Sequence, residues 1–376
     1  MNFLYIAPLP PPINGHSVAA KVLYDQLKVD HTVSEIDLSL SSTSDGTITF
    51  RRFIEVFKVL LRVWIKNRHA DAIYLTISES VAGNIKDLAI YSICFWRLKR
   101  LFIHLHGGSI KKLLFDRYPV LRWLNTIAIR RMAGVIISGR SHADIFASMI
   151  DPHRIHVIPN FAQGGLFIDE HKIAGKFSRL NTLRLLYISG MTPGKGYLQL
   201  LEAYQFLDDS IKQSVHIDFA GRFDSESERD DFTRRIIGIP GITYHGVVDN
   251  ATKESLFANA HIFCLPTSFL EGQPISILEA YASGCVVLTT GQPGILDVFL
   301  DGVNGYLIQP NHPESIRSII TKIHSSFDGL LTIAIHNRRT AADQYRTDVF
   351  AQRVTQAMLS GSISSFAIKD CNNAPN

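Results

Sequence analysis

The chain has 376 residues, of which 46% are hydrophobic, and a formal net charge of +4. Its length suits two domains with cores of their own, and no apolar run reaches the roughly 18 to 20 residues that span a bilayer. The four cysteines lack the spacing of a zinc site, and three lie in apolar runs, which favours reduced thiols over a disulfide framework: Cys94, Cys264, Cys285 and Cys371. The first residues, MNFLYIAPLPPP, are expected to form a strand and not a signal peptide.

Short apolar runs alternate with helical patterns along the chain in two successive series. The first series of expected strands is 3–7, 32–37, 73–76, 101–106, 135–138 and 155–158. After a turn-rich stretch the second series is 183–189, 215–220, 242–245, 262–265, 286–289 and 306–308. Strands that alternate with helices predict two parallel, doubly wound sheets, with the active site in the cleft between the two domains.

Two glutamates stand eight residues apart in the run FLEGQPISILEAYASG. Gly272 and Pro274 predict a loop, and the apolar spacing from Ile275 predicts a helix. Glu271 then lies in a loop directly after a buried strand, where open α/β sheets bind ligands, and Glu279 lies inside the helix. The N-terminus of that helix suits a phosphate, and carboxylates beside it suit sugar hydroxyls. The segment therefore predicts a nucleotide-sugar site, whereas the same pair without this context indicates a solvated helix face.

This segment resembles the E-x7-E motif of retaining glycosyltransferases of family 4, of the type found in bacterial polysaccharide biosynthesis. The later runs CVVLTT and DGVNGYLI follow in the order usual for that family. The resemblance implies an α/β fold of the GT-B type, with two Rossmann-like domains facing a central cleft. Residues 1–165 would bind the acceptor and residues 166–340 the nucleotide-sugar, and a helix at 341–360 would cross back to the first domain. Residues 361–376 are expected to be disordered.

Other turns resemble binding segments of the same family. GMTPGKG, at 190–196, resembles a G-R-x4-K-G turn, so Lys195 is expected to contact the donor diphosphate. Met191 stands where the family often has an arginine, and Arg222 is a candidate to supply the missing charge. The turn has no serine or threonine after its lysine, which disfavours an ATPase P-loop.

Two turns in the first half of the chain complete the resemblance. His106, in the run HGG, matches a family histidine that lies near the transferred sugar. Gly15 matches a P-x-x-G-G turn, with Asn14 in place of its first glycine. His104 lies two residues before His106 and suggests a metal pair, but no carboxylate or cysteine nearby completes a site.

The implied reaction moves a hexose or N-acetylhexosamine from a nucleotide-diphosphate sugar, expected to be a UDP-sugar, with retention and without metal or cofactor. The diphosphate leaves first, stabilised by Lys195 and by helix N–H groups, and the acceptor hydroxyl attacks from the same face. A covalent route through Glu271 stays open. The implied catalytic residues are Glu271, His106 and Lys195, and the implied donor-binding residues are Gly15, Gly190, Lys195, Gly272, Gln273, Pro274, Ile275, Ser276 and Glu279.

Positive charge is concentrated in residues 50–131, which hold 16 Lys and Arg against five Asp and Glu. Basic and aromatic side chains alternate there at helical spacing, as surface-bound membrane helices do, although many such helices are simply solvated. The pattern predicts peripheral attachment to an anionic membrane face. Together with the family resemblance, it implies a cytoplasmic protein at the inner face of the cell membrane, with a lipid-diphosphate-linked glycan acceptor in O-antigen, capsule or exopolysaccharide synthesis. The aromatic residues are Phe53, Phe57, Trp64, Phe95, Trp96, Phe115 and Trp123.

Two other functions compete with glycosyl transfer. A sugar-nucleotide epimerase of similar fold would convert the donor without any acceptor. A nucleic-acid-binding protein would use the basic patch, but the sequence contains no recognisable binding module and the two glutamates would have no role. We therefore expect no nucleic-acid partner.

Overall fold

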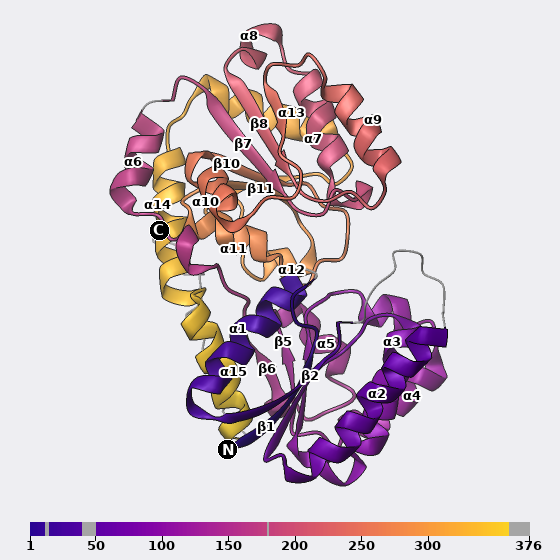
Figure 1. The fold of residues 1–376 in the computed structure, drawn as a ribbon. Helices are drawn as coiled ribbons and strands as arrows, with labels where there is room; N and C mark the ends of the chain where they lie inside the picture. The colour runs from indigo at the N-terminus through magenta and orange to yellow at the C-terminus, as the bar shows by residue number, and fades with distance from the viewer. Residues whose placement is uncertain (12–14, 40–49, 179, 361–376) are drawn as a thin grey trace. The chain divides into compact units, whose positions relative to one another are not determined.

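The computed structural model describes residues 1–11, 15–39, 50–178 and 180–360. They form two compact units, the first made of residues 1–159 together with the last helix from Asp348 on, and the second of residues 160–347. Each unit has one parallel six-stranded sheet with helices packed against it (Figure 1). Asn14 and the predicted tail at 361–376 lie outside the described residues.

The sheet of the first unit has the strand order β2-β1-β3-β4-β5-β6. Its inner strands are mostly apolar because both of their faces are covered, as in β3 (Ala72–Thr76), where every residue is buried. Helices α2, α3 and α4 lie side by side (Figure 1). The other strands are β1 (Asn2–Ala7), β2 (Thr32–Asp37), β4 (Leu101–Leu105), β5 (Gly134–Ile137) and β6 (Ile155–Val157), and the α-helices are α1 (Gly15–Asp30), α2 (Phe50–Lys66), α3 (Val81–Ile93), α4 (Pro119–Ile129), α5 (Ala143–Phe146) and α15 (Thr347–Ser360).

The sheet of the second unit has the order β12-β11-β10-β7-β8-β9. Counted from its first strand this is 3-2-1-4-5-6, the order of dinucleotide-binding sheets, which reverses direction between β7 and β10. Helix α7 packs against α13, whereas α11 packs against α14 (Figure 1). The strands are β7 (Leu183–Ile188), β8 (Val215–Ala220), β9 (Ile242–Tyr244), β10 (Ile262–Leu265), β11 (Val286–Thr290) and β12 (Gly305–Ile308), and the α-helices are α6 (Glu170–Ser178), α7 (Tyr197–Gln205), α8 (Asp209–Lys212), α9 (Glu226–Ile236), α10 (Asn250–Asn259), α11 (Ile275–Ala282), α12 (Pro293–Leu296), α13 (Pro313–Ser325) and α14 (Leu330–Gln344).

The two predicted series of parallel strands are confirmed, with ends that differ by at most one residue. The helix predicted at 341–360 is present as α15 from Thr347, but it is not continuous, because residues 341–344 belong to α14, which stops at Gln344. At the break, the Tyr345 carbonyl accepts a hydrogen bond from the Ala162 amide at 2.7 Å, and Arg346 forms a β-bridge with Ala162. The backbone therefore pairs with another segment where a continuous helix would bond to itself.

Candidate functional site

The C-terminal ends of β7 and β10 are neighbours at the point where the strand order of the second unit reverses. The loop after β7 carries Lys195, and the loop after β10 carries Glu271. Ligands of open α/β sheets bind in the crevice at such a point. The sheet order thus brings together two predicted site residues that are 76 positions apart in the chain.

Lys195 and Glu271 form an ion pair in which the Lys195 ammonium donates to Glu271 Oε1 at 2.6 Å. The Thr267 hydroxyl donates to the same oxygen at 2.8 Å. Both charged side chains are partly shielded from water, with exposed fractions of 26% for Lys195 and 11% for Glu271. From the sequence, Lys195 was expected to contact the donor diphosphate and Glu271 the donor sugar. The structure shows that the two side chains also neutralise each other.

Glycines fix the loop that holds Lys195. Gly196 has φ +87°, and a Cβ there would lie 2.2 Å from the Pro266 carbonyl oxygen, so only glycine fits this position. A Cβ at Gly194 would lie 2.5 Å from the ring of Phe269. The Ser268 amide donates to the Gly194 carbonyl at 2.8 Å. The loop after β7 and the loop after β10 are therefore in close contact, and this contact holds Lys195 against the loop that carries Glu271.

Helix α11 begins at Ile275 as predicted, with Pro274 as its N-cap residue and no side chain capping it. The backbone N–H groups of Ile275 and Ser276 belong to its first turn, which has no intrahelical acceptor to offer them. Pro274, Ile275 and Ser276 are partly exposed, so this end of the helix is open to a ligand. An anion is the favoured ligand there because of the helix dipole.

The loop before α11 is fixed by side chains of the same unit. Gln273 is buried, and its Oε1 accepts from the Asn160 backbone amide at 2.6 Å. The Asn160 side chain in turn donates to the Gln273 carbonyl at 2.9 Å. Gln273 was predicted to bind the donor. Its side-chain oxygen is instead occupied by the Asn160 amide of the same unit. Gly272 is also buried, and a Cβ on Gly294 would lie 1.5 Å from its carbonyl oxygen.

Glu279 lies inside α11 and is almost completely buried. Its Oε1 accepts from the Lys253 ammonium of α10 at 2.5 Å. Burial raises the pKa of the Glu279 carboxyl, and the Lys253 charge acts in the opposite direction. Sequence reasoning missed Lys253, because nothing in the local pattern of α10 separates it from a surface lysine.

The glycine-rich turn differs from the expected phosphate turn at its second position. Met191 is fully buried, and its amide donates to the Arg222 carbonyl at 2.9 Å. The Arg222 side chain is exposed. Gly190, at the start of the turn, is also exposed, and a Cβ added to it would lie 3.7 Å from the Thr192 hydroxyl, an ordinary contact distance.

In the first unit, His106 follows β4 and stacks on His104, with ring centroids 3.8 Å apart. His16, next to Gly15 in the first turn of α1, meets His106 edge-on at 4.4 Å. The Tyr74 hydroxyl and His104 Nδ1 share a hydrogen bond of 2.6 Å. Burial lowers the pKa of all three histidines, to about 4 for His16 and about 3 for His104. The three rings are therefore neutral at physiological pH.

Glu79, which sequence reasoning also missed, shapes the turn after His106. Its Oε1 accepts from the Ser109 amide at 2.6 Å, and a Cβ on Gly107 would lie 1.9 Å from its Oε2. A side chain at position 107 would displace this carboxylate from its present position. Within the described ranges, no three histidine, cysteine, aspartate or glutamate side chains are grouped to hold a metal ion.

The basic region of the first unit exposes large apolar side chains. On α2, Phe57 is 66% exposed and Trp64 is 51% exposed, and on α4 Trp123 is 62% exposed. Cationic groups lie over some of the rings in this region, as Arg68 does over Trp64 at 4.8 Å. Phe115 was wrongly predicted to share this face. It is buried in the core of the unit, because the turn of π-helix at Lys111–Phe115 directs it inward.

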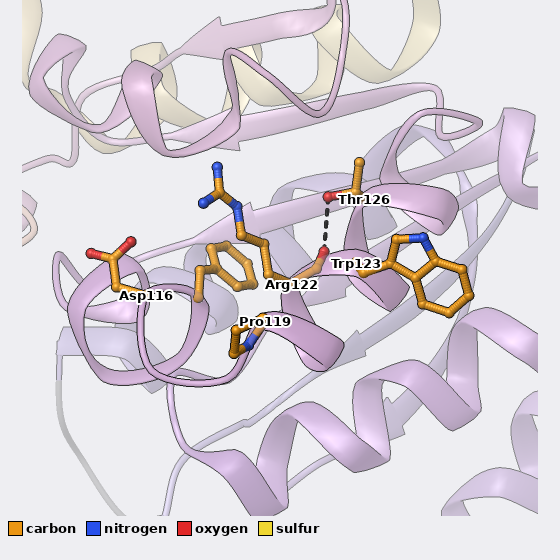
Figure 2. Close-up of a pocket in the computed structure, with 6 residues that line it drawn as sticks. Asp116, Pro119, Arg122, Trp123 and Thr126 are labelled. Carbon is orange, nitrogen blue, oxygen red and sulfur yellow. Dashed lines mark hydrogen bonds between the residues drawn. The ribbon is translucent and has the colours of Figure 1, made fainter.

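A shallow cavity of about 400 Å³ opens on this surface at α4. Figure 2 shows Arg122 between Asp116 and Trp123, with the Thr126 hydroxyl donating to the Arg122 carbonyl. The cavity is lined by Phe115, Asp116, Pro119, Arg122, Trp123 and Thr126.

Among the described helices, none is long and apolar enough to cross a membrane.

Residues 182–326 match the family model for Glycosyl transferases group 1. The matched segment runs from β7 through α13 and contains Lys195, Lys253, Glu271 and Glu279. The match therefore lies within the second unit and covers the segment that holds its candidate site residues. The predicted resemblance to glycosyltransferases is supported at this level.

Individual proteins agree with this assignment. An uncharacterized glycosyltransferase of Methanocaldococcus jannaschii is 25% identical over 158 residues, which is 41% of this chain and 39% of the relative. The GDP-mannose:cellobiosyl-diphosphopolyprenol alpha-mannosyltransferase of Xanthomonas campestris is 24% identical over 259 residues, 66% of this chain and 63% of the relative. The alignments thus span less than two thirds of the length of these curated relatives.

The fold matches that of solved glycosyltransferases along nearly the whole chain. The crystal structure of Anabaena Alr3699/HepE in complex with UDP and glucose has a TM-score of 0.72 and 16% sequence identity, and covers 96% of this chain and 100% of that one. The predicted α/β fold of the GT-B type is confirmed, with its two parallel six-stranded sheets.

Proposed function

We propose that the protein is a retaining glycosyltransferase that takes a hexose or N-acetylhexosamine from a nucleotide-diphosphate sugar. The observation that carries the proposal is the open N-terminus of α11, which has Lys195 and Glu271 beside it and Glu279 one turn within it. An anion site flanked by two carboxylates suits a ligand with a diphosphate between two sets of hydroxyl groups. We propose UDP as the nucleotide, as in the solved structure of similar fold that holds UDP and glucose, whereas the Xanthomonas relative is named for GDP-mannose, so the assay compares both.

In the proposed reaction, the bond between the anomeric carbon and the diphosphate oxygen breaks, and that oxygen keeps the electron pair. Lys195 and the N–H groups of Ile275 and Ser276 stabilise the charge that develops on the leaving diphosphate. The acceptor hydroxyl forms the new bond from the same face, and its proton passes to the departing phosphate oxygen. No metal takes part. The roles of Glu271 on the donor sugar and His106 beside that sugar stay predictions.

Binding of the donor changes the partner of Lys195. A diphosphate that attracts the ammonium draws it from Glu271 Oε1, which then accepts sugar hydroxyls together with the Thr267 hydroxyl bond that it already has. Met191 supplies no charge to the phosphates, so Lys195 and the N-terminus of α11 stabilise the negative charge of the diphosphate. Arg222 pairs through its backbone with the same turn, with an exposed side chain, and is the candidate for a second cation.

The donor is tested by incubating the protein with UDP-, GDP- and ADP-sugars and measuring thermal shifts and released nucleotide. We expect a UDP-sugar to raise the unfolding temperature and to release UDP when membrane extract provides an acceptor. Conversion of the donor to its epimer without extract would instead identify an epimerase. The absence of a shift with every nucleotide would refute the proposed donor site.

For the acceptor, we propose a glycan on a lipid diphosphate at an anionic membrane surface, as in cell-surface polysaccharide synthesis. The exposed aromatic and basic face of α2 and α4 supports this, since rings insert at the interface while Lys and Arg contact anionic headgroups. The name of the Xanthomonas relative, a diphosphopolyprenol mannosyltransferase, supports the same class of acceptor.

Sedimentation with vesicles tests this acceptor surface. Each basic side chain near an anionic membrane is worth about 1 kcal/mol, so replacing the exposed Lys58 and Arg62 by glutamine should weaken binding roughly thirtyfold. Replacing Phe57 and Trp64 by serine should weaken binding to the same vesicles in high salt, where insertion dominates. Nucleotide affinity should stay unchanged in both variants. Wild-type protein that ignores anionic vesicles at low salt would contradict the membrane surface and favour a soluble acceptor.

A further inference from the structure

Lys253 is the residue of the second unit whose position the proposed reaction does not yet explain. It lies in the first turn of α10, a helix whose start is fixed because the Asp249 carboxylate accepts from the Thr252 amide at 2.8 Å. From there its side chain reaches Glu279 on α11, 26 residues further along the chain. The exposed fractions of the two side chains are 20% and 4%, so the pair is largely out of water.

Other charged groups around α11 are directed elsewhere. Lys176 of α6 donates to the carbonyl oxygens of Ala260 and Ser283. Helix α14, which packs against α11, presents the neutral amide of Asn337, bonded to the Cys285 and Asn304 carbonyls. Lys253 is therefore the charged group that acts on the Glu279 carboxylate within the part of the chain that the structure describes.

A buried carboxylate without a cation takes up a proton, because burial disfavours its charged form. Protonated Glu279 would be a weaker hydrogen-bond acceptor than the carboxylate and would carry a proton of its own. Ribose hydroxyls are donors and favour an ionised partner. The Lys253 ammonium opposes protonation while occupying one oxygen, Oε1.

We propose that Lys253 is a positioning residue for the nucleotide: it fixes Glu279 through Oε1 so that Oε2 accepts hydrogen bonds from the ribose hydroxyls. In the described residues, the side-chain hydrogen bond of Glu279 ends at Oε1, which leaves Oε2 for a ligand. The inference rests on the proposed function, since it assigns a nucleotide to this site. It explains why Lys253, with 20% of its side chain exposed, is directed at a buried carboxylate instead of at solvent.

The test is calorimetry of UDP binding between pH 5.5 and 8.5 with wild type, Lys253→Met, Lys253→Arg and Glu279→Gln. Lys253→Met should weaken binding about tenfold or more at pH 7, and the loss should shrink as pH rises and Glu279 ionises. Lys253→Arg should stay within about threefold of wild type. Glu279→Gln should bind weakly with no such recovery. Ratios to wild type cancel the ionisation of the nucleotide itself.

A matched control and a second readout keep the inference falsifiable. Lys172→Met removes an exposed lysine of α6 and should leave UDP affinity unchanged. Adding Lys253→Met to Glu279→Gln should cost little more than Glu279→Gln alone, since the two residues act together. Lys253→Gln replaces the Met variant if that variant does not fold. A Lys253 variant with wild-type affinity at every pH overturns this inference alone, whereas wild type that binds no nucleotide overturns the proposed function with it.

Discussion

Removing the Lys195 ammonium should reduce turnover far more than stability. The ammonium lies 2.6 Å from Glu271 in a loop fixed by Gly196, and under the proposed function this is where the donor phosphates bind. A hydrogen bond to a charged group contributes about 1.5 to 3 kcal/mol, which corresponds to roughly ten- to a hundredfold in rate. Because charge builds up on the leaving diphosphate, the loss in Lys195→Ala should fall mainly on kcat.

The cost to folding is smaller because the pair is not completely dry. Lys195 keeps 26% of its side-chain surface exposed, and in its absence Glu271 still accepts from the Thr267 hydroxyl. We expect the free energy of unfolding to fall by about 1 kcal/mol or less in Lys195→Ala. Urea unfolding measures this change, and nucleotide release from the donor measures turnover.

Two further variants separate charge from shape. Lys195→Arg keeps a cation and should retain most of the activity, whereas Lys195→Met keeps the apolar stem and should lose it. Lys172→Ala, at an exposed position of α6, is the control for removing a lysine from the same unit. Wild-type kcat in Lys195→Met would refute the assignment of this ammonium to the leaving group.

Three other perturbations follow from the same contacts. Calorimetry should show that Glu279→Gln loses affinity for free UDP and UDP-sugar alike, whereas Glu271→Gln loses it mainly for UDP-sugar; equal losses in both would contradict the assigned roles. Gly196→Ala should lower the free energy of unfolding by more than about 1 kcal/mol, because φ is +87° and the Pro266 carbonyl is in the way, while Gly175→Ala, with open space at a helical position, should raise it by about 0.5 to 1 kcal/mol in the same urea titration. Burial lowers the pKa of His16 to about 4, so the unfolded chain binds the extra proton and stability should fall as pH drops from about 6.5 towards 4; His16→Gln should flatten that decline, and an unchanged pH profile would argue against a buried neutral ring.

The sheets could be predicted from the sequence because most strands are short apolar runs bounded by turn residues. The start of α11 could also be predicted. Pro274 is disfavoured inside a helix, because it lacks an N–H group and its ring clashes with the preceding turn, and the apolar spacing begins directly after it. The break between α14 and α15 was not predictable, because it depends on a backbone pairing with Ala162, almost two hundred residues earlier.

The same distinction holds for the site. The two glutamates stand out locally through their spacing, but Lys253 and Asn160 act on this segment from elsewhere in the chain. Asn160 binds Gln273 across 113 positions. Such partners are set by how helices and loops pack, and a single sequence records no signal for them. Phe115 was misplaced for a related reason: helical spacing alone does not show which residues of an irregular turn point inward.

Under the proposed function, the ion pair between Lys195 and Glu271 makes the site selective for phosphorylated sugars. A free hexose carries no phosphate and would meet a glutamate whose oxygen is already taken by an ammonium. Only a molecule that brings its own anion can draw the lysine away and expose the carboxylate to hydroxyl groups. Under the proposed function, the two ends of the donor would then bind cooperatively, and abundant free sugars would be poor competitors for the enzyme.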